Sequence, residues 1–384
     1  MIKKRNICIV SSSRADYNHL FLLMKTLKAS KEINFKLLVT GMHLLKEFGE
    51  TYKEIIKDGF QIDAFVKNKS YKGSSNASLS IMSDQLKNIS NQLDMIKPDI
   101  VVILGDRYDI LQVAISCHIK NIPIAHFHGG EVTHGAIDDA IRHSITKFSD
   151  IHFVADKIFA KRVQQLGENP RNIHNIGSLG VLAIKATKKI NKSDILKKYN
   201  IQGKYILIAL HPETINADTK SVTESLFTVL SKQKNLHIVF SAPNSDPGSN
   251  MILRNIKSFI KLFPHTSSFI VSAGREDFIN LIRYAELIIG NSSSCLIEAP
   301  ALGTTSLIIG KRQNGRPLAK TVNKSGISYN AISNCMNKLL AENSKPIKDK
   351  NLAYKSSNSL LRITKILSKI SLDSIKLKRF IDYK

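Results

Sequence analysis

Short apolar runs alternate along this chain with longer segments of helical periodicity. In the first half, the runs are NICIV (6–10), FKLLVT (35–40), DIVVIL (99–104), IPIAHF (122–127) and IHFVA (151–155). Successive apolar positions are typical of a strand that is buried on both faces in a parallel sheet. Between the runs, segments such as 19–30, 44–59 and 109–121 carry apolar residues at helical spacing. This alternation predicts an α/β domain built on a parallel sheet.

The second half of the chain repeats the plan. Its apolar runs are YILIAL (205–210), LHIVFSA (236–242), FIVSA (269–273), LIIG (287–290) and TSLIIG (305–310), with helical patterns at 223–235 and 276–286. We therefore predict two Rossmann-like doubly wound domains, residues 1–180 and 201–360, joined by a lysine-rich linker at 181–200. Residues 361–384 have an amphipathic helical pattern, and we expect a tail that closes over one domain or the other.

The formal net charge of +25 in 384 residues raises the question of a nucleic-acid partner. The lysines are spread along the whole chain without interleaved aromatic residues, so a solvated surface is favoured. The cysteines form no CxxC pair and suit buried thiols of a reducing compartment; they are Cys8, Cys117, Cys295 and Cys335. The apolar run near the N-terminus is too short to span a membrane. We expect a cytoplasmic protein with neither a nucleic-acid nor a membrane partner.

Polar loops follow the predicted strands of the first domain, and open parallel sheets bind their ligands at such positions. The loop SSSRADYN (11–18) offers Arg14 among small residues, a combination that can hold a phosphate through backbone N–H groups and a bidentate guanidinium. The loop GDRYD, which follows residue 104, presents Asp106 and Arg107. GxGxxG is absent after every predicted strand, which argues against a dinucleotide-dependent dehydrogenase.

The stretch HFHGGEVTHGAIDDAIRHSITK (126–147) is dense in polar side chains. We expect Gly129 and Gly130 to let the backbone approach a ligand closely and to present Glu131. The histidines of this stretch raise the question of a metal site; they are His126, His128, His134 and His143. Neither HExxH nor another convincing ligand spacing is present, so no metal is predicted.

The same stretch places Asp138 four residues before Arg142, so we expect the carboxylate and the guanidinium to share one face of a helix. The alternative is that Asp138 and Asp139 cap this helix, and the two roles are compatible. Asp106, Glu131 and Asp138 follow neighbouring strands. Because close carboxylates push each other's pKa values apart, these three predict an acid/base cluster.

The second domain carries hydroxyl and basic groups in its own strand-end loops. HPET offers His211, GNSSSCLIEAP offers Ser292 and Ser293 with Glu298 behind them, and GKRQNGR offers Arg312. Small residues, hydroxyls and backbone N–H groups at a helix start suit a diphosphate. The asymmetry between the halves predicts a cleft in which one domain grips a nucleotide diphosphate and the other performs proton chemistry on the attached group.

Taken in order from residue 6 to about residue 316, the motifs resemble those of the hydrolysing UDP-N-acetylglucosamine 2-epimerases of sialic acid biosynthesis. The motifs are SSSRADY, TGMH, LGDRYD, HGGE with IDDAIRHSITK, HPET, PNSDPGS, GNSSSCLIEAP and GKRQNGR. The resemblance implies a GT-B-like pair of domains with an interdomain cleft. It also implies conversion of UDP-N-acetylglucosamine and water into N-acetylmannosamine and UDP, by elimination to a glycal followed by addition of water.

The resemblance implies roles for individual residues as well. The catalytic set is Asp106, Glu131, Asp138 and His211, and the substrate-binding set is Arg14, Arg107, Arg142, His143, Asn244, Ser292, Ser293, Glu298 and Arg312. Within these sets Arg14, Arg107, His211, Ser292 and Ser293 are expected to hold the departing diphosphate. Glu298 is expected to accept from the ribose hydroxyls, and Arg312 to line the nucleotide pocket. No cofactor or metal is implied, a UDP-sugar is the expected partner, and the expected assembly is a homo-oligomer, a dimer or a tetramer.

Two other enzymatic functions stay open. Many relatives have one residue fewer between GGE and the aspartate pair, and HPVT in place of HPET, and these loops are candidates for the sugar pocket. Relatives on the legionaminic acid pathway share most of the other motifs, so UDP- or GDP-N,N'-diacetylbacillosamine is an alternative substrate. A GT-B glycosyltransferase is the second alternative, although that reaction does not need three carboxylates in the first domain.

Overall fold

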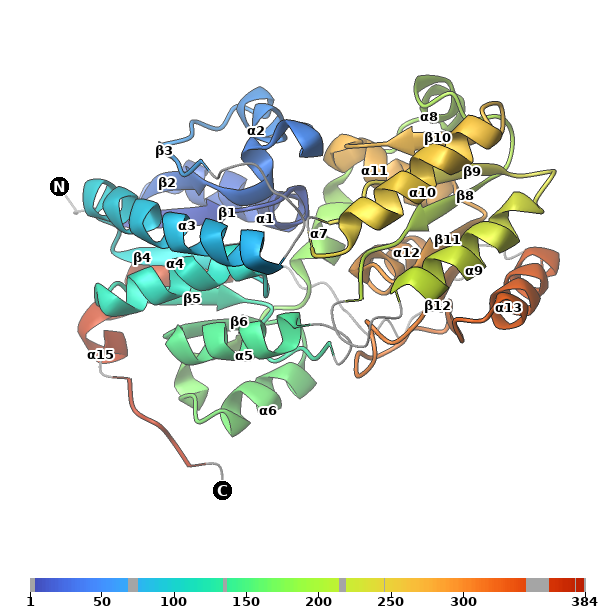
Figure 1. Cartoon of the computed structure of the whole chain (residues 1–384). Coiled ribbons are helices and arrows are strands. Elements are labelled where there is room, and N and C mark those ends of the chain that lie inside the picture. The colour runs from blue at the N-terminus through green and yellow to red at the C-terminus, as the bar shows by residue number, and fades with distance from the viewer. Residues whose placement is uncertain are drawn as a thin grey trace.

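The computed structural model describes residues 4–67, 75–133, 137–213, 219–244, 246–342, 359–376 and 378–382. It contains two all-parallel sheets, one in each half of the molecule (Figure 1). The first has the order β3-β2-β1-β4-β5-β6-β7 and the second β10-β9-β8-β11-β12-β13. In both sheets the strand order reverses beside the first strand of the half, which is the hallmark of a doubly wound fold. The prediction of two Rossmann-like domains is confirmed.

The strands of the first sheet are β1 (Arg5–Ser11), β2 (Ile33–Val39), β3 (Ala64–Phe65), β4 (Ile100–Leu104), β5 (Ile124–Phe127), β6 (Ile151–Val154) and β7 (Ile173–Asn175). Those of the second are β8 (Tyr205–Ala209), β9 (His237–Ser241), β10 (Ser267–Ile270), β11 (Leu287–Gly290), β12 (Ser306–Ile309) and β13 (Val322–Ser325). Every residue of β4, β5, β8, β9, β11 and β12 is buried. The apolar runs were therefore sound predictors of strands covered on both faces.

The helices that lie against the sheets have the following bounds. They are α1 (Arg14–Ala29), α2 (Tyr52–Lys57), α3 (Ser75–Ile96), α4 (Tyr108–Ile119), α5 (Asp138–Phe148), α6 (Lys157–Gln165), α7 (Leu179–Ala186), α8 (Lys192–Lys198), α9 (Thr219–Ser231), α10 (Ser249–Leu262), α11 (Gly274–Tyr284), α12 (Glu298–Leu302), α13 (Tyr329–Ala341), α14 (Leu360–Lys369) and α15 (Leu372–Lys376). Within the described ranges, none is long and apolar enough to cross a membrane.

Helix α1 shows how a strand-end loop becomes a fixed part of the cleft. Ser13 is its N-cap, and the Asp16 carboxylate accepts from the backbone N–H groups of Ser12 and Ser13, both at 3.0 Å, which completes a capping box. On its inner face Leu20 and Leu27 are fully buried against the sheet. Each such leucine contributes about 1.5–3 kcal/mol. The start of α1, and Arg14 with it, is therefore rigidly placed.

The helix expected over 44–59 is interrupted. Residues Gly41–Leu44 and Lys46–Phe48 form 3-10 turns, and α2 begins only at Tyr52. Gly49 lies between them with φ of 84°, a left-handed conformation that ends the second turn. The short strands β3, β7 and β13 were not anticipated, because two to four residues at a sheet edge leave little periodic signal.

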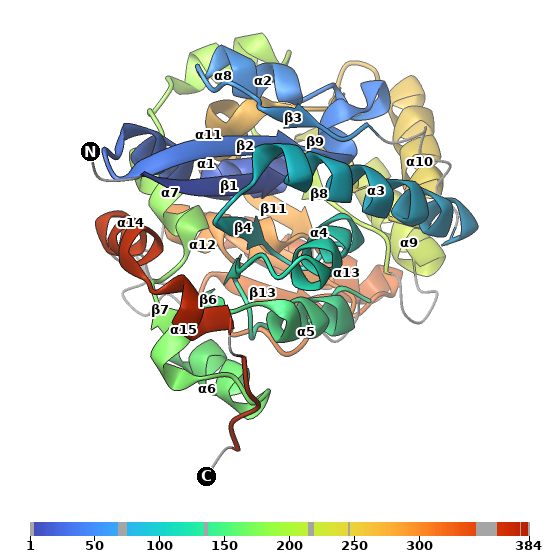
Figure 2. The same cartoon turned by 90° about the vertical axis from the view of Figure 1, so that its left-hand side faces the viewer.

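The two domains are joined by helices rather than by an extended linker. Helix α7 contacts both α1 of the first domain and α12 of the second, and its Leu179 and Val181 enter different apolar cores. Helix α14 returns to the first domain, where Ile363 and Leu367 are fully buried near α1 (Figure 2). The C-terminal segment thus closes over the first domain.

Candidate active site

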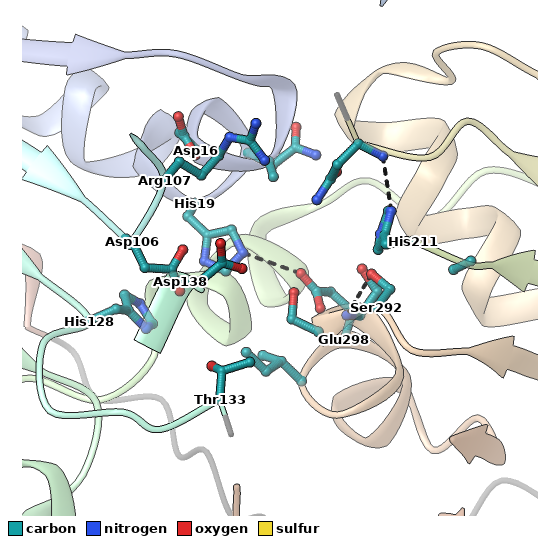
Figure 3. Close-up of a pocket in the computed structure, with 18 of the residues that line it drawn as sticks. Asp16, His19, Asp106, Arg107, His128, Thr133, Asp138, His211, Ser292 and Glu298 are labelled. Atoms are coloured by element: carbon teal, nitrogen blue, oxygen red, sulfur yellow. Dashed lines mark hydrogen bonds and ion pairs between the residues drawn. The ribbon is translucent and has the colours of Figure 1, made fainter. Parts of the chain in front are cut away.

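A polar cleft lies between the carboxyl ends of the two sheets (Figure 3). It holds about 1210 Å³ of empty space, part of it open to solvent. Asp106, Asp138 and His128 lie on the side of the first domain, opposite residues such as His211 and Glu298 of the second (Figure 3). The structure brings together, along this cleft, all of the predicted site residues except His143; they are Arg14, Asp106, Arg107, Glu131, Asp138, Arg142, His211, Asn244, Ser292, Ser293, Glu298 and Arg312.

His143, which was expected to bind substrate, does not line the cleft. Its ring lies on α5 outside the lining of the cleft, with Nε2 3.7 Å from the Asp139 carboxylate one helical turn away. Helical periodicity explains this position, since residue 143 lies five positions after Asp138 and therefore faces away from it.

Arg142 is the anchor of the first-domain side and is 1 % exposed. Its guanidinium is ion-paired with Asp106 and donates to the Thr133 hydroxyl and the Glu131 carbonyl, both at 2.9 Å. A weaker contact at 3.4 Å reaches the Asp139 carboxylate. Because these acceptors come from three separate segments, Arg142 fixes their relative positions at the edge of the cleft.

Asp138 does not pair with Arg142, contrary to the expectation from their spacing. It is the first residue of α5, its carboxylate faces the cleft, and Arg312 of the second domain donates to it at 3.2 Å. The capping alternative is also wrong, because Ile137 occupies the N-cap position and both aspartates lie inside the first turn of the helix. In place of Asp138, it is Asp139 that contacts Arg142 and accepts from the backbone N–H of Thr133.

The three predicted acid/base carboxyls have different electrostatic surroundings. Burial and the neighbouring Asp106 charge raise the pKa of Asp138 to about 6. Burial also raises the pKa of Asp106, but the charges of Arg142 and Arg316 outweigh it and hold that pKa below its usual range. The pKa of Glu131 falls to about 2, because Arg316 and His128 outweigh the effect of burial. Asp138 is thus the carboxyl that changes charge near neutral pH.

Glu131 is held on both sides. Its carboxylate lies 2.7 Å from Nδ1 of His128 and 3.3 Å from the guanidinium of Arg316, which belongs to the second domain. His128 has a φ of 65°, a left-handed conformation rare for a residue with a side chain. Its backbone N–H donates to the Phe153 carbonyl at 2.9 Å, so the surrounding strands maintain this strained conformation beside the cleft.

The glycines of HGGE are required by the packing of the loop; the prediction that they let the backbone approach a ligand is wrong. A Cβ at Gly130, where φ is 77°, would lie 2.4 Å from the Phe159 carbonyl oxygen, and a Cβ at Gly129 would lie 3.0 Å from the Thr146 hydroxyl. Neither glycine lines the cleft. These residues let the loop lie directly against α5 and α6, which presents Glu131 to the cleft.

On the second-domain side, His211 is buried and neutral. Its Nδ1 accepts from the backbone N–H of Asn244 at 3.0 Å, so the ring proton is on Nε2. Burial and the charges of Arg312, Arg107 and Arg14 hold the pKa of His211 well below its usual value. The backbone of His211 is bracketed by Asn291, which accepts at 2.8 Å and donates at 2.9 Å. His211 is consequently a fixed hydrogen-bond donor at the end of β8.

Ser292 and Ser293 follow β11, whose last residue, Gly290, approaches β8 closely. A Cβ at Gly290 would lie 2.0 Å from the Ala209 carbonyl oxygen, so only glycine fits there. The expected helix start is a 3-10 turn, Ser293–Cys295, with the Ser292 hydroxyl accepting from the N–H of residue 294. Both serines line the cleft.

Several residues in or beside the cleft were missed by the sequence analysis. Arg316 lies in the same loop as Arg312, and a second arginine there was a signal that went unused. Asp246 of the PNSDPGS motif lies outside the cleft lining and pairs with the cleft residue Arg107 at 3.2 Å. His19 projects from α1 and lies 3.4 Å from Glu298 across the cleft (Figure 3), and nothing in its sequence context marks it.

Among the described residues, no cluster of three or more His, Cys, Asp or Glu side chains could hold a metal ion. Of the histidines considered for such a site, His126 lies buried in β5 with Nε2 2.8 Å from the Gly105 carbonyl. His134 lies outside the described residues.

Two doubly wound domains with this cleft between them define a GT-B-like protein. Residues 25–368 match the family described as UDP-N-acetylglucosamine 2-epimerase, and the chain belongs to this family of enzymes. It is 35 % identical over 386 residues to the GDP/UDP-N,N'-diacetylbacillosamine 2-epimerase (hydrolyzing) of Campylobacter jejuni, covering 99 % of this chain and 100 % of that protein.

Two further similarities agree with this assignment. The chain is 36 % identical over 388 residues to the polysialic acid biosynthesis protein P7 of Escherichia coli, covering 99 % of this chain and 96 % of that protein. The structure of the Methanocaldococcus jannaschii UDP-GlcNAc 2-epimerase, in complex with UDP-GlcNAc and UDP, superposes with a TM-score of 0.78 at 19 % identity, covering 94 % of this chain and 99 % of that one. The latter confirms the GT-B-like fold.

Proposed function

We propose that this enzyme is a hydrolysing 2-epimerase that converts UDP-N-acetylglucosamine and water into N-acetylmannosamine and UDP. The observation that carries the proposal is the division of the cleft: the carboxyls of Asp106, Glu131 and Asp138 on one domain face a neutral histidine, serines and arginines on the other. Such a division suits a substrate with an anionic diphosphate at one end and a proton to be moved at the other. The relatives named for polysialic acid biosynthesis and for a hydrolysing 2-epimerase support it.

The reaction has two steps. A base removes the proton from C2 while the bond from C1 to the UDP oxygen breaks with its electron pair, which leaves a C1–C2 double bond and free UDP. Water then adds its hydroxyl to C1, and a proton is delivered to C2 from the opposite face. Both steps need positioned acids and bases, and the first needs stabilisation of the charge on the departing diphosphate.

We assign one of the two proton transfers at C2 to Asp138, since a single carboxyl faces one side of the sugar only. A pKa of about 6 lets this carboxyl give or accept a proton near neutral pH, whereas Asp106 and Glu131 are held as anions by arginines. In this assignment the two anions orient the sugar and the cations around it.

The diphosphate is assigned to the second-domain loops and Arg14. The Nε2–H of His211 and the hydroxyls of Ser292 and Ser293 are donors that line the same part of the cleft. Arg14 adds a half-buried positive charge from the start of α1, and its guanidinium lies over the Phe278 ring at 5.4 Å. Hydrogen bonds to charged groups in such surroundings are stronger than those between neutral groups.

This assignment predicts weaker nucleotide binding when a donor is removed. His211→Ala and Ser293→Ala should each lower UDP affinity by about 1–3 kcal/mol, or about 5- to 150-fold in Kd, because each deletes a donor to the diphosphate. Isothermal titration calorimetry measures the change. Ser231→Ala, on the outer helix α9, is the matched control and should bind UDP as the wild type does. Unchanged affinity in both cleft variants would place the diphosphate elsewhere.

One alternative substrate has direct support. The 35 % identity to the bacillosamine 2-epimerase extends over that whole protein, so a UDP- or GDP-linked N,N'-diacetylbacillosamine fits as well as UDP-N-acetylglucosamine. The purified enzyme should be given each sugar nucleotide separately, without an acceptor sugar, and the products followed by proton NMR. Release of UDP with a free 2-epimerised sugar supports hydrolysis, and the faster substrate identifies the sugar. UDP release that depends on an added acceptor would instead indicate a glycosyltransferase.

A further inference from the structure

Glu213 lies two residues after His211, and its side chain is buried at 5 % exposure although it ends in a carboxyl group. Its Oε1 accepts from the backbone N–H groups of Lys311 at 2.9 Å and Arg312 at 3.3 Å. The loop after β8 is thereby tied to the turn after β12, which runs from Gly310 to Arg316. Thr219 in turn fixes Glu213, because its hydroxyl accepts from the Glu213 backbone N–H at 2.9 Å.

The turn is shaped around this carboxylate. Gly310 has a φ of 82°, and a Cβ added to it would lie 2.1 Å from Oε1 of Glu213. Glycine is therefore required both for its backbone conformation and for the space that the carboxylate occupies. A buried carboxylate that accepts from two successive backbone N–H groups holds the backbone in one arrangement.

The same turn carries two cations across the cleft. The Arg312 guanidinium donates to Asp138 at 3.2 Å and, on its own domain, to the Asn291 carbonyl at 3.3 Å. Arg316 lies 3.3 Å from the Glu131 carboxylate and donates through Nε to the Val132 carbonyl at 3.3 Å. Asp138 and Glu131, two of the three acid/base carboxyls, therefore contact arginines of a turn whose backbone is held by Glu213.

We propose that Glu213 is a positioning residue that sets the turn 310–316 so that Arg312 and Arg316 reach Asp138 and Glu131. This inference rests on the proposed function, because only in that reaction does the position of the two arginines affect proton transfer. Glu213 does not line the cleft, so we assign its effect on the cleft to its hydrogen bonds with the turn.

The consequence for Asp138 follows from the charges that face it. Burial, Asp106 and Asp246 raise its pKa, whereas Arg312 and Arg107 lower it. If the turn is released, Arg312 moves away while the other groups stay, so the pKa of Asp138 rises further above its present value of about 6. Less of the carboxyl is then ionised at pH 7, and the acid limb of the rate profile moves to higher pH.

The test compares three substitutions at one position. Glu213→Ala removes the acceptor, Glu213→Asp keeps the charge but withdraws it by one methylene, and Glu213→Gln keeps an oxygen where Oε1 lies. We expect kcat to fall about 10- to 100-fold in the Ala and Asp variants, the scale of loss for displaced active-site groups. The acid limb of their pH–rate profile should move to higher pH. The Gln variant should retain most of the wild-type kcat, and the acid limb of its pH–rate profile should stay at the wild-type pH. Glu224→Ala, on the exposed face of α9, is the control.

A second measurement needs no turnover. The titration of Asp138 is followed by 13C NMR of protein labelled at the aspartate carboxyl carbons, with Asp138→Asn identifying the signal. The pH midpoint of the Asp138 titration should be higher in Glu213→Ala and Glu213→Asp than in the wild type. In Glu213→Gln it should equal that of the wild type. An unmoved midpoint in the first two variants overturns the inference, as does a Gln variant that loses as much rate as Ala. Absence of activity in the wild type would count against the proposed function alone, because the titration still decides the role of Glu213.

Discussion

Asp138→Asn is expected to lower turnover of the UDP-sugar about 100-fold or more, the usual scale for loss of a general acid or base. Asparagine keeps the shape of the side chain and a hydrogen-bond acceptor for Arg312, but it cannot transfer a proton. The melting temperature should hardly change, because burial and Asp106 already disfavour the Asp138 charge and Arg312 keeps its bond to the Asn291 carbonyl. Turnover and thermal unfolding are measured on the same preparation.

The matched control is Asp156→Asn. Asp156 is the N-cap of α6, where its carboxylate accepts from the backbone N–H of Ile158 at 2.9 Å. Asparagine caps a helix about as well as aspartate, so both turnover and stability should stay close to the wild type. Near-normal turnover in Asp138→Asn would remove this carboxyl from the proton-transfer step.

Arg142→Met is expected to destabilise the protein by about 1–3 kcal/mol, since it leaves a half-buried carboxylate and two buried hydrogen-bond acceptors without their donor. Asp106 would lose its principal counter-charge, and the Thr133 hydroxyl and the Glu131 carbonyl would lose their donor. The pKa of Asp106 should rise as well, so turnover should fall together with stability. Urea unfolding monitored by circular dichroism gives the free energy of unfolding.

Arg171→Met serves as the control for this substitution, because Arg171 is exposed in the 3-10 turn Pro170–Asn172. Exposed substitutions of this kind change stability by about 0.5 kcal/mol or less. A loss below about 1 kcal/mol in Arg142→Met would show that the buried network around Asp106 does not hold this side of the cleft together.

The fold could be predicted from the sequence because a buried strand is marked by its own run of apolar residues. Runs such as DIVVIL and YILIAL are apolar at successive positions, and the strands β4 and β8 that they form are buried throughout. Where several interactions compete, the pattern was a poorer guide. The 44–59 segment has helical periodicity, yet the left-handed Gly49 divides it into separate turns.

The loops of the cleft could be located from sequence, but the pairing of their side chains could not. Helical spacing suggested an Asp138–Arg142 pair, whereas Arg142 points inward to Asp106 and Asp138 points outward to Arg312. The partner of Asp138 lies 174 positions along the chain, and only the closed arrangement of the two domains brings it near. The role of Glu213 could not be predicted for the same reason, because it depends on a contact between distant loops.

The central claim is elimination at C2 followed by hydrolysis, and the fate of the C2 hydrogen tests it most directly. UDP-N-acetylglucosamine is incubated with the enzyme in heavy water, and the free sugar is analysed by proton NMR and mass spectrometry. The mechanism predicts N-acetylmannosamine with deuterium at C2, because the proton returned to the glycal comes from a group that exchanges with solvent. N-acetylmannosamine that retains its original hydrogen at C2 would contradict elimination, and N-acetylglucosamine as the released sugar would contradict epimerisation.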